Sequence, residues 1–388
     1  MDDVYVTGLG VVCCLGTGVD RFWRGMAAAR SSPVPTTDPY AHVTVPLLYA
    51  VPSKDRPGAD SGWGSTTHLA VAAAEQAVAD AGLSLTARDG MAVVVGTGMG
   101  DADRHETWRL AGFPQDDRWI PGFAVGSTVA GRLGATGAVI TVSNACAAGG
   151  CAVSMAADLV RTGEATVAVA VGAEAYSRVA LACFDRLGAL DPRECRPFSR
   201  DRRGTVFGEG AAALVLESAA QADRRPPATR YARLAGAGWS CDAYHPTAPE
   251  PDGTQIVRAM VAALAEAGAT ADQLGCLVPH GTGTELNDRT ESEAVHTALG
   301  ARAVDLPLYS LKALIGHTGG AAGAMAAVAA TLIVHHGTVP GNVPLGEQDP
   351  DCKVWLPMAA VPVAGRFTML NAYAFGGNNI SLVLERAA

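Results

Sequence analysis

The stretch VSNACAAGG, residues 142–150, decides the fold of this chain. The β-branched run before it, residues 138–142, predicts a buried strand, and the breaker-free residues 151–160 predict a buried helix. Cys146 therefore lies where a strand turns into a helix, and a helix start favours negative charge. We expect a lowered pKa for the Cys146 thiol and a nucleophilic cysteine. From these residues alone, a buried structural cysteine is the alternative.

Composition restricts the class of protein. The chain has 388 residues, of which 49% are hydrophobic and 17% charged, and this favours a large core over disorder. The net charge of −9 argues against a nucleic-acid partner. Nine cysteines without a CxxC pair argue against a disulfide framework and against a zinc site. The chain enters a strand at once without a leader-like segment, and its longest apolar stretch, residues 319–334, is too short for a membrane span. We expect a cytoplasmic protein that binds no membrane and no metal.

The pattern around Cys146 occurs a second time around His317. A predicted strand at residues 307–311 ends in Lys312, and the small-residue turn 316–323 leads into another Ala-rich helix. This repetition predicts an α/β fold of two related halves, with parallel central strands flanked by helices. A charged, Pro-containing linker near residues 221–229 separates the halves, which we place at residues 1–220 and 230–388. Residues 101–125 show no periodicity and predict no regular element.

Four reactive side chains lie at predicted strand ends or helix starts, where α/β sheets present ligands: Cys146, His280, Lys312 and His317. A lone histidine or lysine of this kind is commonly structural. Their shared position in glycine-rich turns favours a site, because such turns let the backbone approach a ligand closely. Gly8 and Gly10 do not make a dinucleotide-binding loop, because the third glycine and the acidic partner are missing. A dehydrogenase therefore ranks last among the possible functions.

Five motifs carry a resemblance to a known family, and they span nearly the whole chain: NACAAGG (144–150), VFGEGAAALVLE (206–217), PHGTGTELNDRTE (279–291), SLKALIGHTGGAAG (310–323) and NAYAFGGNN (371–379). In these motifs and their order the chain resembles the β-ketoacyl-acyl-carrier-protein synthases, condensing enzymes of the thiolase-like superfamily. The resemblance implies a five-layer αβαβα fold, in which duplicated α/β halves enclose buried central helices.

The resemblance also implies the chemistry. Cys146 would take an acyl group from a thioester, and the enzyme would condense it with a malonyl thioester as CO2 leaves. His280 and His317 would hold the malonyl thioester oxygen, where two N–H donors stabilise the enolate electrostatically. Lys312, with Glu291 as its partner, would set the local field and hold His317 in place. We expect both histidines to be needed for decarboxylation but not for acylation of Cys146, and iodoacetamide to label Cys146 first.

Further residues receive roles only through this resemblance. The backbone N–H groups of Cys146 and Phe375 would form the oxyanion hole, and Thr282 and Thr284 would bind pantetheine. Phe184 and Phe375 would shape the acyl pocket and its gate. The chain would need no cofactor of its own, because its substrates are carried on the phosphopantetheine of an acyl carrier protein.

The resemblance further implies partners. The chain would form a homodimer, or a heterodimer with a ketosynthase-like paralogue. Carrier proteins of this class are acidic and this chain is acidic too, so docking requires a local basic patch. We assign that patch to Arg202 and Arg203, in an arginine-rich loop. The other interpretation of this loop is internal ion pairing.

Departures from the family pattern leave other functions open. The region 96–146 is several residues shorter than usual, and Ala374 replaces a glycine of the gate loop. We therefore expect polyketide, or else fatty-acid, biosynthesis. One alternative is a non-catalytic subunit resembling a chain-length factor, which Cys146 and the two histidines disfavour. Another is a thiolase-like acyltransferase without decarboxylation, which the paired histidines disfavour.

Overall fold

The computed structural model describes residues 3–56, 62–84, 86–113, 120–224, 229–344 and 346–387. The main elements of the first half are β1 (Val4–Cys13), α1 (Val19–Ala28), α2 (Ser65–Asp80), β5 (Ala92–Gly96), α3 (Ala102–Leu110), α4 (Ala124–Leu133), β6 (Val139–Val142), α5 (Ala148–Arg161), β7 (Val167–Glu174), α6 (Arg178–Arg186) and β9 (Gly210–Ser218). Those of the second half are β10 (Ala232–Cys241), α8 (Thr254–Ala267), β11 (Leu274–Val278), α9 (Glu285–Leu299), α10 (Lys312–Ile315), α11 (Ala322–His336), β14 (Phe367–Tyr373) and β15 (Asn378–Arg386). Short elements are β2 (Gly16–Thr17), β3 (Val34–Pro35), β4 (Leu47–Tyr49), β8 (Phe207–Gly208), α7 (Ala219–Asp223), β12 (Thr338–Val339) and β13 (Val361–Pro362).

The sheet repeats one pairing pattern in both halves. Its strand order is β11-β14-β15-β10-β1-β9-β7-β5-β6. In the first half β9 pairs antiparallel with β1 and with β7, and β5 lies parallel to β7 and β6. In the second half β15 pairs antiparallel with β10 and with β14, and β14 lies parallel to β11. The two halves are therefore related, as the sequence predicts.

The prediction of parallel central strands is wrong for the middle of this sheet. Strands β9 and β15 run antiparallel to both of their neighbours. Apolar periodicity predicts that a strand is buried but carries no information about its direction.

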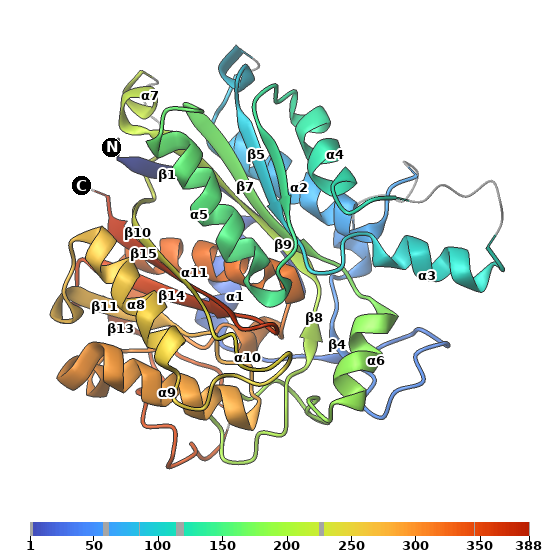
Figure 1. Ribbon diagram of the computed structural model, residues 1–388, viewed down its shortest axis with the longest axis vertical. Helices are drawn as coiled ribbons and strands as arrows, with labels where there is room; N and C mark the ends of the chain where they lie inside the picture. Colours follow the sequence, from blue (N-terminus) through green and yellow to red (C-terminus); the bar gives the residue numbers. More distant parts are fainter. Residues whose placement is uncertain are drawn as a thin grey trace.

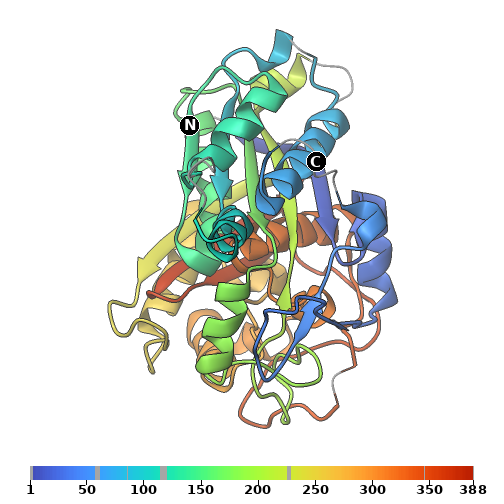
Figure 2. The ribbon, with the colours of Figure 1, turned by 90° about the vertical axis from the view of Figure 1, so that its right-hand side faces the viewer.

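Helices and sheet alternate in five layers (Figures 1 and 2). Helices α5 and α11 pack against each other and lie between the two halves of the sheet. Helices α2 and α4 cover the outer face of the first half, and α8 packs on the outer face of the second half with α9 against it. Helices α3 and part of α4 fall in the region 101–125, so the prediction of no regular element there is wrong.

Small residues let α5 and α11 approach closely at the ends that carry the reactive side chains. A Cβ atom on Gly149 would lie 2.8 Å from the backbone nitrogen of Ala324, and one on Gly323 would lie 2.3 Å from that of Gly150. The expectation that the apolar stretch from residue 319 is too short for a membrane span is wrong, because Gly319–His336 is long and apolar enough to cross one; 83% of it is buried inside the molecule. This close crossing brings the starts of the two buried helices together.

Candidate active site

Cys146 lies in a short 3₁₀ turn, Ala145–Ala147, between β6 and α5. Ala145 adopts a positive φ of 51°, which is uncommon for a residue with a side chain and makes the turn tight. Burial raises the pKa of the Cys146 thiol to about 11, although the charge of Lys312 and the N–H groups of Phe375 and Cys146 act to lower it. The predicted lowering of this pKa is therefore wrong, because desolvation of the sulfur outweighs the helix start.

His317 lies directly beside the thiol. Its Nε2 lies 3.1 Å from the Cys146 sulfur. Burial, followed by the charge of Lys312, lowers the pKa of His317 well below its usual value, so the ring is neutral at pH 7. Among the described residues, its Nδ1 has no hydrogen-bond partner, so neither tautomer is fixed. The ring can therefore accept the thiol proton in one tautomer and donate from Nε2 in the other.

His280 follows β11 and faces His317, with ring centroids 5.7 Å apart. The backbone N–H of Tyr373 donates to His280 Nδ1 at 3.2 Å. Burial, with the charges of Lys312 and His317, lowers the pKa of His280 well below its usual value. The ring is therefore neutral and carries its proton on Nε2, where it can donate to a substrate oxygen.

Lys312 and Glu291 hold the His280 loop and not His317, which corrects the prediction. The Lys312 ammonium group donates to the carbonyl oxygen of His280 and lies 3.4 Å from its Nδ1. The Glu291 carboxylate accepts the N–H groups of His280 and Gly281, each at 2.7 Å. Burial raises the pKa of Glu291 to about 7 and lowers that of Lys312, while the Glu291 charge raises the Lys312 pKa. The four-residue helix α10 turns the chain between Lys312 and His317, so the lysine points to the other histidine.

Two cavities meet at the Cys146 sulfur. The threonine-lined cavity, of about 520 Å³, contains Thr205, Thr247, Thr282 and Thr284 along its wall, together with both histidines. The apolar cavity, of about 370 Å³, is lined mainly by apolar side chains of α6 and neighbouring loops. Phe184 and Phe375 line both cavities and stack on each other with centroids 5.0 Å apart. The predicted gate residues therefore lie at the junction of the two cavities.

The site thus combines a buried thiol, a neighbouring base and a neutral imidazole donor. The backbone N–H groups of Phe375 and Cys146 lie close enough to the sulfur to oppose the rise that burial causes in the pKa of the Cys146 thiol. Donors beside the sulfur could also stabilise charge on the oxygen of an acyl group held there. No group of three or more His, Cys, Asp or Glu side chains that could hold a metal ion occurs within the described residues.

Family models match both halves of the chain. Residues 61–222 match "Beta-ketoacyl synthase, N-terminal domain" and residues 231–345 match "Beta-ketoacyl synthase, C-terminal domain". The chain belongs to the beta-ketoacyl synthase family. The domain boundaries at 220 and 230 stay a prediction.

Relatives of this beta-ketoacyl synthase cover the chain almost end to end. Nodulation protein E of Rhizobium meliloti (strain 1021) is 34% identical over 99% of both chains. The tetracenomycin polyketide synthase ketoacyl synthase alpha subunit of Streptomyces glaucescens is 34% identical over 99% of this chain and 97% of its own.

Solved structures agree with the expected thiolase-like fold. The ishigamide ketosynthase/chain length factor gives a TM-score of 0.92 at 35% identity, with full coverage of both chains. A second structure shows a type II polyketide synthase acyl-carrier protein in complex with its ketosynthase bound to the hexaketide. It gives a TM-score of 0.90 at 28% identity, also with full coverage of both chains.

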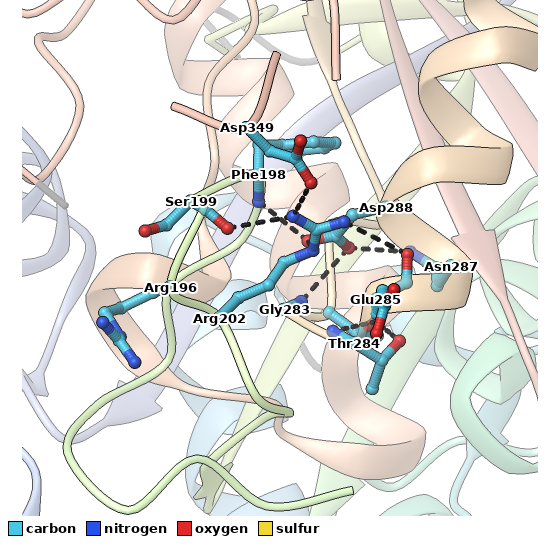
Figure 3. Close-up of polar contacts among 12 residues, drawn as sticks. Arg196, Phe198, Ser199, Arg202, Gly283, Thr284, Glu285, Asn287, Asp288 and Asp349 are labelled. Carbon is cyan, nitrogen blue, oxygen red and sulfur yellow. Dashed lines mark hydrogen bonds and ion pairs between the residues drawn. The ribbon is translucent and has the colours of Figure 1, made fainter. Parts of the chain in front are cut away.

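Most of the predicted residues of this beta-ketoacyl synthase line the two cavities or hold the His280 loop, but the two arginines differ in exposure. Thr282 and Thr284 line the threonine-lined cavity, and their hydroxyl oxygens lie 2.8 Å apart. Arg203 is exposed on the rim of the same cavity. The side chain of Arg202 is only 2% exposed and is paired with Asp288 and Asp349 (Figure 3). The prediction that Arg202 docks a carrier protein is therefore wrong, because its charge is neutralised inside the molecule.

Glu174 is a residue of this site that motif spacing does not reveal. It ends β7, is buried, and accepts the N–H groups of Gly98, Met99 and Gly320 at 2.7, 3.0 and 2.8 Å. These bonds tie the turn after β5 to the turn before α11, and the Glu174 charge acts to raise the pKa of Cys146. The signal in the sequence is a lone carboxylate directly after an apolar strand.

Proposed function

We propose that this chain is a β-ketoacyl-acyl-carrier-protein synthase that condenses an acyl group held on Cys146 with malonyl carried by an acyl carrier protein. The observation that supports this most is the contact of His317 Nε2 with the Cys146 sulfur, with the neutral His280 facing the same place. A buried thiol with a pKa of about 11 needs such a base in order to react at neutral pH.

In the loading step, the Cys146 sulfur attacks the carbonyl carbon of the acyl thioester while its proton passes to His317 Nε2. The N–H groups of Cys146 and Phe375 stabilise the oxyanion of the tetrahedral intermediate. The carbon–sulfur bond to pantetheine then breaks, and the leaving sulfur takes the proton back from His317. The acyl chain is left on Cys146 and extends into the apolar cavity.

In the condensing step, malonyl-pantetheine enters along the threonine-lined cavity, where Thr282 and Thr284 bind the pantetheine arm. CO2 leaves, and the electron pair of the broken carbon–carbon bond forms an enolate. The His280 Nε2–H donates to the enolate oxygen, and His317 donates from Nε2 when its proton lies there. The enolate carbon attacks the acyl carbonyl, the carbon–sulfur bond to Cys146 breaks, and the thiolate leaves. It takes one proton from water by way of His317, which is the proton that the overall decarboxylative condensation consumes.

We propose an acyl carrier protein as the partner, as in the related complex, with docking at the rim of the threonine-lined cavity beside Arg203. We also propose a dimer, either with a second copy or with a ketosynthase-like paralogue. Large hydrophobic side chains exposed on the first half of the chain support it: Val139 on the edge strand β6, and Met99, Leu110, Phe113, Phe123 and Val179. The nine cysteines, all unpaired, support a cytoplasmic location, and the product class is a polyketide or a fatty acid.

The test is incubation with malonyl-carrier protein and a panel of acyl-carrier proteins, read by intact mass and by CO2 release. We expect a mass increase on the wild-type chain, none on Cys146→Ala, and a β-ketoacyl product. A wild-type chain that acquires acyl groups without CO2 release would instead be an acyltransferase. A chain that neither acquires acyl groups nor releases CO2, even with a paralogue present, would be a non-catalytic partner subunit.

A further inference from the structure

Arg202 lies where the loop of Ser199, the turn before α9 and the loop of Asp349 meet (Figure 3), and it is one of the residues that line the threonine-lined cavity. Its guanidinium donates to the Ser199 carbonyl at 2.9 Å, to the Glu285 carbonyl at 3.2 Å and to the Asp349 carboxylate. Its Nε lies 3.5 Å from a carboxylate oxygen of Asp288. The planar fork of arginine suits this use, because it can reach several acceptors in fixed directions at once.

Asp288 is the acceptor that connects this arginine to the substrate-binding turn. The Asp288 side chain has no exposed surface. One carboxylate oxygen accepts the Gly283 N–H at 3.2 Å, and the other accepts the Phe198 N–H at 2.8 Å. Burial raises the pKa of Asp288, and the Phe198 N–H and the Arg202 charge oppose that rise. Through its bond with the Gly283 N–H, Asp288 therefore holds the backbone between Thr282 and Thr284.

The turn itself leaves little freedom once that bond is made. Gly283 has a φ of +84°, and a Cβ atom there would lie 2.6 Å from the Gly204 carbonyl oxygen, so only glycine fits this position. The Gly283 carbonyl accepts the Gly204 N–H at 3.0 Å. The hydroxyls of Thr282 and Thr284 are hydrogen-bonded to each other, so a shift of Gly283 moves both.

From these contacts we propose that Arg202 is a positioning residue for pantetheine: by neutralising Asp288 it fixes the turn that presents Thr282 and Thr284 to the substrate arm. The proposal rests on the proposed function, because it takes a pantetheine thioester as the substrate. Removing the arginine would leave a buried carboxylate without its cation, and the loops around it would rearrange to hydrate it. The threonine hydroxyls would then lose their alignment, whereas Cys146 and His317, held by other elements, would keep theirs.

The test compares Arg202→Gln with Arg202→Lys, with the double variant Arg202→Gln/Asp288→Asn, and with Arg200→Gln as the matched control. Arg200 lies in the same loop, but its ion pair with Glu347 is exposed. The probe is S-methyl pantetheine, which cannot react. We would measure the concentration that halves iodoacetamide alkylation at Cys146, read by peptide mass spectrometry, and the KM and kcat for malonyl-pantetheine.

We expect Arg202→Gln to raise the half-protecting concentration and the KM by on the order of tenfold or more, because small displacements of binding groups carry large penalties. The unprotected alkylation rate at Cys146 and the kcat should stay within about twofold, since the reaction centre is intact. Arg202→Lys and the double variant should recover part of the affinity. The lysine keeps the charge, and the asparagine removes the unpaired charge while keeping an acceptor for Gly283.

Equal protection of the wild type and Arg202→Gln would overturn the proposal. The proposal would also be overturned if the alkylation rate without S-methyl pantetheine fell by as much as the protection did, both in Arg202→Gln and in Arg202→Gln/Asp288→Asn. The arginine would then support the whole fold and not the binding turn alone. Failure of the proposed function looks different: the wild-type chain would release no CO2, whatever the protection by S-methyl pantetheine.

Discussion

Replacing His280 with alanine is the sharpest test of the reaction centre, because the structure separates the two histidines. His317 lies 3.1 Å from the sulfur, whereas His280 is anchored through Nδ1 by the Tyr373 N–H and offers its Nε2–H to the substrate. We therefore expect His280→Ala to lose malonyl decarboxylation while acyl loading of Cys146 continues.

The expected size of the loss follows from the surroundings of His280. The residue is 4% exposed and neutral, so its N–H acts in a nearly dry site. Losing one such donor costs about 2.7–4 kcal/mol, or about 10²–10³ in rate. The alanine also leaves the Tyr373 N–H and the Lys312 ammonium without their acceptor on the ring, which costs about 1–3 kcal/mol of folding stability.

The assay measures CO2 release from malonyl-carrier protein and, separately, acylation of Cys146 by intact mass. His280→Asn is the matched control, because its amide can accept from Tyr373 with the oxygen and donate with the nitrogen. We expect His280→Asn to keep the folding stability of the wild type and to recover part of the rate of CO2 release. CO2 release by His280→Ala at the wild-type rate, or an equal fall in acylation, would refute this assignment of roles.

Three further predictions concern the base, the thiol and helix α6. His317→Ala should slow both acylation of Cys146 and CO2 release by about 10²-fold or more, because the base beside the sulfur is gone. Acylation at the wild-type rate would contradict this prediction and would support the expectation that His317 serves decarboxylation only. Because burial raises the pKa of Cys146 to about 11, the rate of its alkylation by iodoacetamide should still rise with pH above pH 9. The exposed Cys183 should be alkylated before Cys146, which is the reverse of the order expected from the sequence. An alkylation rate of Cys146 that stops rising below pH 8 would show that its pKa is low. Glu106 accepts the Ser177 hydroxyl and the N–H groups of Arg178 and Val179 at the start of α6, so Glu106→Ala should weaken that turn by about 0.5–2 kcal/mol, seen as faster hydrogen exchange at these amides and not in α5.

Local sequence was sufficient to predict two reactive side chains that the structure brings into contact, Cys146 and His317. Cys146 and His317 each lie in a short turn that precedes an Ala-rich helix, and this pattern depends only on neighbours in the chain. Cys146 follows strand β6, whereas His317 follows the short helix α10, which the predicted strand at residues 307–311 did not anticipate. The repetition of the pattern also predicted two related halves. Strand direction could not be predicted in this way, because alternation and burial look alike in parallel and antiparallel strands.

The tertiary structure alone decided how those residues are charged and paired. Cys146 and His317 are 171 residues apart, and the Lys312 ammonium meets a histidine 32 residues before it and not the one five residues after it. The high pKa of Cys146 and the burial of Arg202 both result from the packing of distant elements around these side chains. Desolvation and counter-charge depend on which distant elements pack around a group, whereas a helix start or a glycine turn depends on a few adjacent residues.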